Sequence, residues 1–214
     1  MKIIDLGVCE YSLAEMVQKE IHQRRVKDQI EDTIIFTIHP PVITLGKNGK
    51  MENLLVPLAE LKRRGIAFYR TERGGDITYH GYGQLLVYPI FFLPGGIGGI
   101  RRFINYWEEI IIATLETFGI QAQSDAKRIG IYVGEEKIAS IGFALKARVT
   151  YHGLALNVYD DLQPFSLINP CGQKGVKMTA LEKILGRKVE MAEVKERILK
   201  NVGEKILRFY GRDH

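Results

Sequence analysis

The sequence is poor in cysteine, since its 214 residues include only Cys9 and Cys171. Two cysteines cannot form the dense disulfide framework of a small secreted domain, and a chain of this length buries a sizeable core without one. We therefore expect both thiols to be free. The sequence also contains no CxxC and no HExxH pattern, so it signals no metal site.

Nucleotide-binding signatures are missing as well. No GxxxxGK[ST] phosphate loop occurs, because Gly46-Lys47 is followed by Asn48. The glycine run 95–99 lacks the GxGxxG spacing of a dinucleotide site, and we interpret it as a flexible connector. Nothing in the sequence therefore indicates a bound cofactor.

One charge-free stretch, residues 81–100, is long enough to span a bilayer. It contains Pro89, Pro94 and six glycines, which break a helix, so it predicts a strand followed by a loop. The N-terminal residues include Asp5 and Glu10 and have no apolar segment typical of a signal peptide. We expect a soluble protein of the cytoplasm that does not bind membranes.

The composition that remains is that of an ordinary globular domain, with 46% hydrophobic and 26% charged residues. Lys and Arg number 30 against 25 Asp and Glu, which gives a net charge of +5. This modest excess favours acidic partners but does not by itself indicate nucleic acid. With no repeat or linker, residues 1–214 are expected to form a single domain.

The hydrophobic periodicity of the sequence predicts both helices and strands. The first predicted helix begins at a capping box, Ser12 with Glu15, and its expected apolar face is Leu13, Met16, Val17 and Ile21. Further helices are predicted over 57–65, 102–118, 179–186 and 191–209, the third of them capped by Thr179. Strands are predicted over 3–8, 33–38, 66–71, 84–92, 129–133, 137–145 and 149–158.

Tight turns at 133–137 and 146–148 join the last three predicted strands into an antiparallel meander. The predicted fold class is therefore α+β, with a mixed, largely antiparallel sheet and flanking helices.

The densest polar cluster is RGGDITYHGYGQ, residues 73–84. Its paired glycines let the backbone approach a ligand, while Arg73, Thr78 and His80 supply hydrogen-bond donors. A glycine-rich turn with Arg73 exposed to solvent would explain the same residues. The variety of functional groups favours a ligand site.

Cys171 lies in a loop that Pro170 and the flanking glycines impose. Lys174, Lys177 and a nearby helix N-terminus place positive potential beside the thiol, which favours the nucleophilic thiolate. The same spacing also fits a partly exposed cysteine without a role. Cys9, at a strand end, is interpreted as a packing residue.

Lys137 begins a strand whose alternate residues are apolar. It is either a strand-edge lysine that reaches solvent or a buried amine with a function. The small residues of 140–142 and 153–155 leave room for a slender ligand. His22 and His39 have no second partner in the sequence, and we interpret them as structural.

Taken together, these segments resemble the lipoyl(octanoyl) transferases of the LipB type, which share a fold with the lipoate and biotin protein ligases. The resemblance runs through roughly two-thirds of the chain as one colinear series. Tyr82 departs from it, since the family usually has proline there. The matching segments are HPPVITLG (39–46), RGGDITYHGYGQ (73–84), KIASIG (137–142), HGLALNV (152–158) and PCG (170–172).

The resemblance implies a biotin/lipoate protein ligase catalytic-domain fold and octanoyl transfer from octanoyl-acyl carrier protein to a lipoyl-domain lysine, the first step of protein lipoylation. Cys171 would carry the octanoyl group as a thioester, and Lys137 would favour the thiolate and relay protons. No cofactor is implied. The acyl site would be lined by Arg73, Gly74, Gly75, Asp76, Ile77, Thr78, Tyr79, His80, Ser140, Ile141, Gly142, Gly153, Leu154 and Ala155.

The implied partners are octanoyl-acyl carrier protein as donor, and lipoyl domains of 2-oxoacid dehydrogenase complexes and the glycine cleavage H protein as acceptors. The alternatives are an ATP-dependent lipoate or biotin protein ligase, which would tolerate loss of Cys171, and a non-catalytic module for acidic partners. A basic surface that attracts acidic domains is expected among Arg24, Arg25, Lys62, Arg63, Arg64, Arg101 and Arg102.

Overall fold

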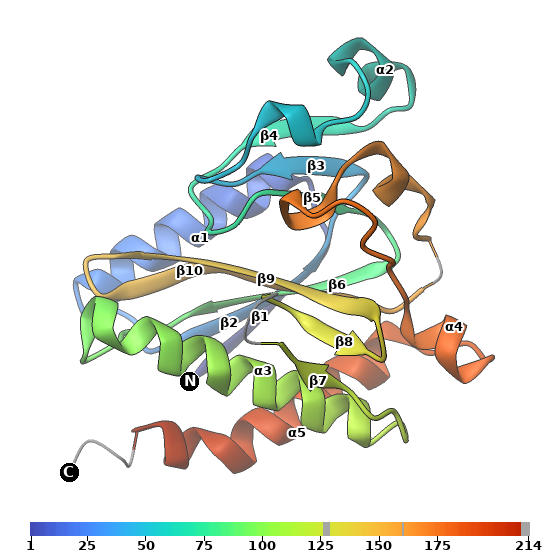
Figure 1. Ribbon diagram of the computed structural model, residues 1–214. Coiled ribbons are helices and arrows are strands. Elements are labelled where there is room, and N and C mark those ends of the chain that lie inside the picture. The colour runs from blue at the N-terminus through green and yellow to red at the C-terminus, as the bar shows by residue number, and fades with distance from the viewer. Residues whose placement is uncertain (126–128, 160, 211–214) are drawn as a thin grey trace.

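The computed structural model describes residues 1–125, 129–159 and 161–210. Two sheets organise these residues (Figure 1), one of seven strands in the order β1-β2-β6-β10-β9-β8-β7 and one of three in the order β4-β3-β5. The larger sheet consists of β1 (Lys2–Val8), β2 (Thr33–Ile38), β6 (Gln84–Ile90), β7 (Gln123–Ser124), β8 (Ile131–Val133), β9 (Glu136–Lys146) and β10 (Val149–Asn157).

In the larger sheet, β1 and β2 pair in parallel, and the other described pairs are antiparallel. Tight turns connect β8 to β9 and β9 to β10 at the predicted positions. The α+β class and the mixed, largely antiparallel sheet are confirmed.

Helices cover both faces of the larger sheet. Figure 1 shows α3 (Ile100–Glu116) and α5 (Met191–Tyr210) on one face and α1 (Tyr11–Val26) on the other. Successive strand side chains point to opposite faces, so Ile34 of β2 joins the core under α3 and α5 while Ile35 joins the core under α1. The burial of both faces explains why the central strands are continuous apolar runs.

The smaller sheet stands over the α1 side of the larger one (Figure 1) and has a core of its own. Its strands are β4 (Ala67–Arg70), β3 (Val42–Leu45) and β5 (Ile77–His80), with α2 (Leu58–Arg63) beside them. A short 3₁₀ turn, Pro170–Gly172, packs against β5. This arrangement brings the Cys171 turn to the gap between the two sheets.

Half of the predicted face of the first helix is confirmed, since Ile21 is buried and Val17 packs against the same core, and half is wrong. Glu10 is the N-cap residue, without a side-chain capping bond, and Leu13 and Met16 are 53% and 67% exposed. The buried side includes Tyr11 and Gln18, whose polar groups bond to Thr71 and to the main chain of His152. Hydrogen bonds to the neighbouring sheets, together with the packing of Val17 and Ile21, orient this helix.

Other differences are smaller. The predictions missed β3, which is short and follows two prolines, β5, which lies inside the polar cluster, and the two-residue β7. The short helix α4 (Leu181–Leu185) is capped by Ala180 rather than Thr179. The backbone of Thr179 is instead hydrogen-bonded to Lys137.

The charge-free stretch 81–100 forms β6, a 3₁₀ turn at Gly96–Gly99 and the first residue of α3. Over residues 1–125, 129–159 and 161–210, no helix has both the length and the hydropathy of a bilayer span.

Candidate active site

Lys137 and Cys171 meet in space. The Nζ atom of Lys137 lies 3.0 Å from Sγ of Cys171 and donates a second hydrogen bond of 2.8 Å to the carbonyl oxygen of Ile129. Lys137 is 1% exposed, whereas Cys171 is partly accessible. The strand-edge interpretation of Lys137 is therefore excluded.

The main chain brings these two side chains together. The N–H of Lys137 donates to Lys177 O at 2.8 Å, and its carbonyl accepts from the N–H of Thr179 at 2.9 Å. This short parallel pairing attaches the segment after Cys171 to the start of β9. Gly130 makes room for the lysine, because a Cβ atom there would lie 2.4 Å from Lys137 Cε.

Cys171 itself has a strained backbone, with a φ of 57° in the left-handed region that non-glycine residues rarely adopt. Hydrogen bonds of the turn hold it, including one of 2.9 Å from Gly172 N to Asn169 O. Asn53 fastens the turn from outside: its carbonyl accepts from Asn169 N, and its side chain donates to Asp76 Oδ2 at 2.8 Å. Such strain in a pocket is typical of functional residues.

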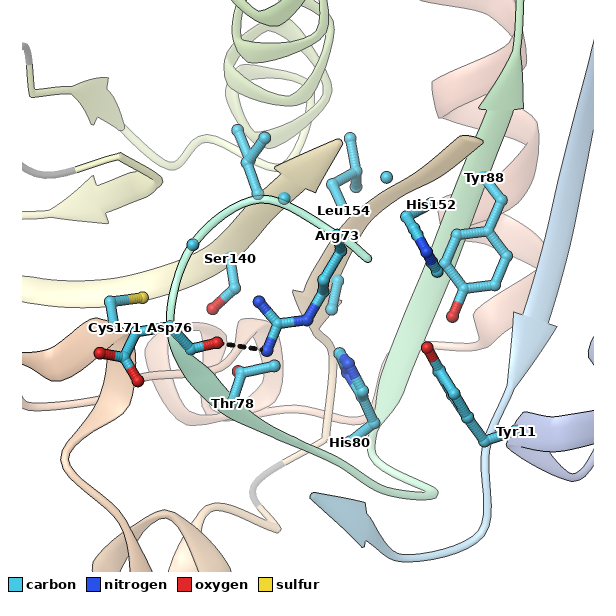
Figure 2. A pocket seen from close by; sticks show the side chains of 15 residues that line it. Tyr11, Arg73, Asp76, Thr78, His80, Tyr88, Ser140, His152, Leu154 and Cys171 are labelled. Atoms are coloured by element: carbon cyan, nitrogen blue, oxygen red, sulfur yellow. Dashed lines mark hydrogen bonds between the residues drawn. The ribbon is translucent and has the colours of Figure 1, made fainter. Parts of the chain in front are cut away.

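Arg73 is turned inward, which excludes the solvent-exposed alternative. Its Nε donates to Thr44 Oγ1 at 3.0 Å, and its Nη2 donates to Thr44 O at 2.7 Å and to Asp76 O at 2.6 Å (Figure 2). Burial lowers the pKa of the guanidinium, against the opposing effect of nearby Tyr11 and Cys171. The side chain thus organises the loop and places positive charge near the thiol.

The thiol of Cys171 lines a pocket between the two sheets. Figure 2 shows Cys171 at one side of it and Tyr11 and Tyr88 at the opposite side. Eleven of the predicted site residues line this pocket together with Cys171: Arg73, Gly75, Asp76, Thr78, His80, Ser140, Ile141, Gly142, Gly153, Leu154 and Ala155.

Three predicted site residues lie elsewhere. Ile77 and Tyr79 alternate with the pocket-lining residues of β5 and belong to the core of the smaller sheet. Gly74 packs its main chain against β9, with its N–H donating to Phe143 O at 2.9 Å. The prediction assigned every residue from Arg73 to His80 to the site. It did not take into account that successive side chains of a strand point to opposite faces.

Tyr11, Tyr88 and His152 also line the pocket and were missed. With Thr71 and His39 they form what we term the polar wall. Tyr11 Oη donates to Thr71 Oγ1 at 3.0 Å, which lies 3.3 Å from His152 Nε2, and Tyr88 Oη lies 2.8 Å from His39 Nε2. His152 stands in the matched HGLALNV segment, which was a usable signal, whereas Tyr11 and Tyr88 had none.

The histidines around the pocket are neutral near pH 7. Burial lowers the pKa of His39 to about 4 and the pKa values of His80 and His152 to about 3. Within the described ranges, no group of three or more His, Cys, Asp or Glu side chains is placed to hold a metal ion.

At one side of this pocket the thiol of Cys171 lies 3.0 Å from the amine of the buried Lys137, and small residues such as Gly142 and Ala155 line the same pocket. An amine within hydrogen-bond distance of a thiol is an arrangement by which enzymes activate a nucleophile. The Lipoyl protein ligase A/B catalytic domain matches residues 10–203, so the chain belongs to that family.

Two curated relatives are named octanoyltransferase. The one from Caldicellulosiruptor saccharolyticus is 44% identical, over 95% of this chain and 88% of its own. The one from Dictyoglomus thermophilum is 46% identical, over 90% and 82% respectively. The prediction of an acyltransferase of the octanoyltransferase type is confirmed, and the ligase alternative is not favoured.

The fold is shared with the solved structure of a putative lipoate protein ligase from T. acidophilum with bound lipoic acid. The TM-score is 0.73 at 17% identity, over 96% of this chain and 85% of that one. The predicted likeness to the lipoate ligase fold is confirmed.

Proposed function

We propose that this acyltransferase takes octanoyl from octanoyl-acyl carrier protein onto Cys171 as a thioester and passes it to the lysine of a lipoyl domain. The 3.0 Å contact between Lys137 Nζ and Cys171 Sγ, inside the pocket, carries the proposal. The chain 1–214 would act as a single catalytic domain in the cytoplasm.

The lysine serves both halves of the reaction. The ammonium of Lys137 stabilises the thiolate of Cys171, which attacks the carbonyl carbon of the donor thioester. When the carrier thiolate leaves, it takes a proton from Lys137, which becomes a neutral amine. The acceptor lysine then attacks the Cys171 thioester and loses its proton to Lys137, and the departing thiolate restores the starting ion pair. Because a thioester becomes an amide, no nucleotide is needed.

The pocket suits an unbranched acyl tail. Ala155 pairs with Ser140 across β10 and β9, so small residues face each other beside the thiol. At Gly153 a Cβ atom would lie 2.0 Å from Val87 O, which shows how closely β6 and β10 approach. The lipoic acid bound to the T. acidophilum ligase supports a fatty tail as the ligand of this fold.

The basic surface predicted for partner binding is largely neutralised. Arg25 bonds to Asp28 and Asp32, and both Arg63 and Arg64 bond to Glu60. Exposed lysines instead lie on the loops whose backbones contact the site. We propose that these residues, termed the basic rim, attract the acidic donor and acceptor domains: Lys47, Lys174 and Lys177.

One experiment tests the proposed chemistry. The protein is incubated with octanoyl-acyl carrier protein without ATP, and its intact mass is recorded. We expect a gain of one octanoyl group that hydroxylamine removes and that Cys171→Ala abolishes. A Cys9→Ala variant is the matched control and should acylate normally. A wild-type protein that gains no mass, or a Cys171→Ala protein that gains it, would refute the proposal.

A further inference from the structure

The pocket contains one buried hydroxyl without a partner. Among the described residues that line the pocket, Thr78 is the one whose buried side-chain polar atom makes no hydrogen bond. The residue is 5% exposed, so water does not readily replace the missing partner. Burying a hydroxyl in this way is unfavourable, and such groups in native proteins call for an explanation.

The neighbours of Thr78 are already engaged. Thr44 is its register partner across β3 and β5, and the Thr44 hydroxyl accepts from Arg73 Nε at 3.0 Å. His80, two residues further along β5, bonds to Gln84 Oε1 at 3.0 Å. The hydroxyl of Thr78 is therefore left for a group that the protein itself does not supply.

The position of Thr78 on β5 indicates which atom that group presents. Side chains two apart on a strand share a face, so Asp76, Thr78 and His80 all point into the pocket. Asp76 stands at the Cys171 turn, since its Oδ2 would lie 2.8 Å from a Cβ atom on Gly172. Along β5, Thr78 therefore stands between Asp76, which reaches the Cys171 turn, and His80. Figure 2 shows Cys171, Thr78 and His80 around the same pocket. An acyl group carried by the sulfur would enter the pocket that Thr78 lines.

An octanoyl thioester offers one good hydrogen-bond acceptor, its carbonyl oxygen. We propose that the Thr78 hydroxyl donates a hydrogen bond to this oxygen and stabilises the negative charge that develops on it when a thiolate or an amine attacks the carbonyl carbon. Thr78 itself transfers no proton. When the nucleophile attacks, the C=O π electrons move to the oxygen, and they re-form the C=O bond when the leaving thiolate departs. The inference rests on the proposed function and assigns a further catalytic residue to it.

Single-turnover acylation by octanoyl-acyl carrier protein tests the role, with the acyl-enzyme followed by rapid quench and intact mass. Thr78→Val replaces the hydroxyl by a methyl group of similar size. We expect it to slow acylation about 100-fold, with the donor concentration at half saturation changed by less than about threefold. Thr78→Ser should keep most of the wild-type rate. Thr114→Val, which alters a buried threonine of α3, is the control and should acylate normally.

The pair Thr78→Ser and Thr78→Ala shows the same contrast if valine disturbs folding, because both lose the methyl group and only serine keeps the hydroxyl. The inference is overturned if Thr78→Val acylates within about threefold of the wild type, or if serine is as slow as alanine. It is also overturned if Ser140→Ala, rather than Thr78→Val, produces the loss. A wild-type protein that never acylates refutes the proposed function instead, so the two failures are distinguishable.

Discussion

The two ends of the pocket are built differently. At the thiol end, Cys171 lies in a strained turn, and the amine of Lys137, near the start of β9, is buried beside it. At the opposite end, the polar wall consists of tyrosine, threonine and histidine side chains. They lie on α1, β6 and β10 and directly after β2 and β4. Under the proposed function, the reacting thiol and amine lie at one end of the pocket, and uncharged hydroxyl and imidazole groups lie at the other.

Removing the charge at the thiol end should have the largest effect. Lys137→Met keeps the apolar stem and loses the ammonium, so acylation at neutral pH should fall by about 10²- to 10³-fold. Recovery should be partial as the pH rises and more thiolate forms. Rates of acyl-enzyme formation between pH 6.5 and 9 measure this.

The matched control is Lys188→Ala, which removes an exposed lysine far along the sequence. If Lys137→Met acylates at the wild-type rate at neutral pH, the proton-relay role is wrong and the two ends do not differ as described.

The second test uses the neutrality of the wall. Burial lowers the pKa of His39 to about 4 and that of His152 to about 3, whereas unfolded histidine titrates near 6.5. The unfolded chain therefore takes up protons first, and stability present above pH 6.5 is lost as the pH falls toward 4. Each histidine contributes roughly 1.4 kcal/mol per pH unit in that window.

His152→Asn should accordingly reduce the pH dependence of the unfolding free energy by about that amount per unit between pH 6 and 4. Asparagine suits the position, because the residue has a φ of 57°. Urea unfolding at several pH values measures the slope. An unchanged slope would show that His152 already carries a proton in the folded state.

The smallest effect is expected at the hydroxyl of Tyr11. Tyr11→Phe removes its bond to Thr71 and should lower the unfolding free energy by about 1 kcal/mol. Acylation should stay within about threefold of the wild type, since no charge is lost, and the pH slope should match that of the wild type. A large loss of acylation with unchanged stability would mean that the wall takes part in the chemistry.

The sequence predicts the thiol end better than the wall. Cys171 and Lys137 stand in short motifs of unusual composition, and the resemblance to a family implied a catalytic role for both. The residues alone also fitted a cysteine without a role and a lysine that reaches solvent at the strand edge. Their contact depends on the pairing of residues 177–179 with Lys137, a two-bond connection that no periodicity reveals.

The tyrosines of the wall were missed because they carry no local signal. Tyr11 lies just before the predicted helix start at Ser12, and two residues of the predicted apolar face, Leu13 and Met16, face solvent. Tyr88 sits in a strand that is buried on both sides, where a tyrosine and a phenylalanine have the same pattern. Only the bonds formed across the fold distinguish these positions, and those bonds depend on long-range contacts.

Gly130 shows that a site can depend on a side chain that is missing. It bears no group that could react, yet even one methyl there would displace the stem of Lys137. The contact between Cys171 and Lys137 thus depends partly on the absence of a side chain at Gly130. A search of the sequence for reactive residues would not select this glycine. Gly130→Ala would slow the proposed reaction by displacing the amine of Lys137, although every reacting group would still be present.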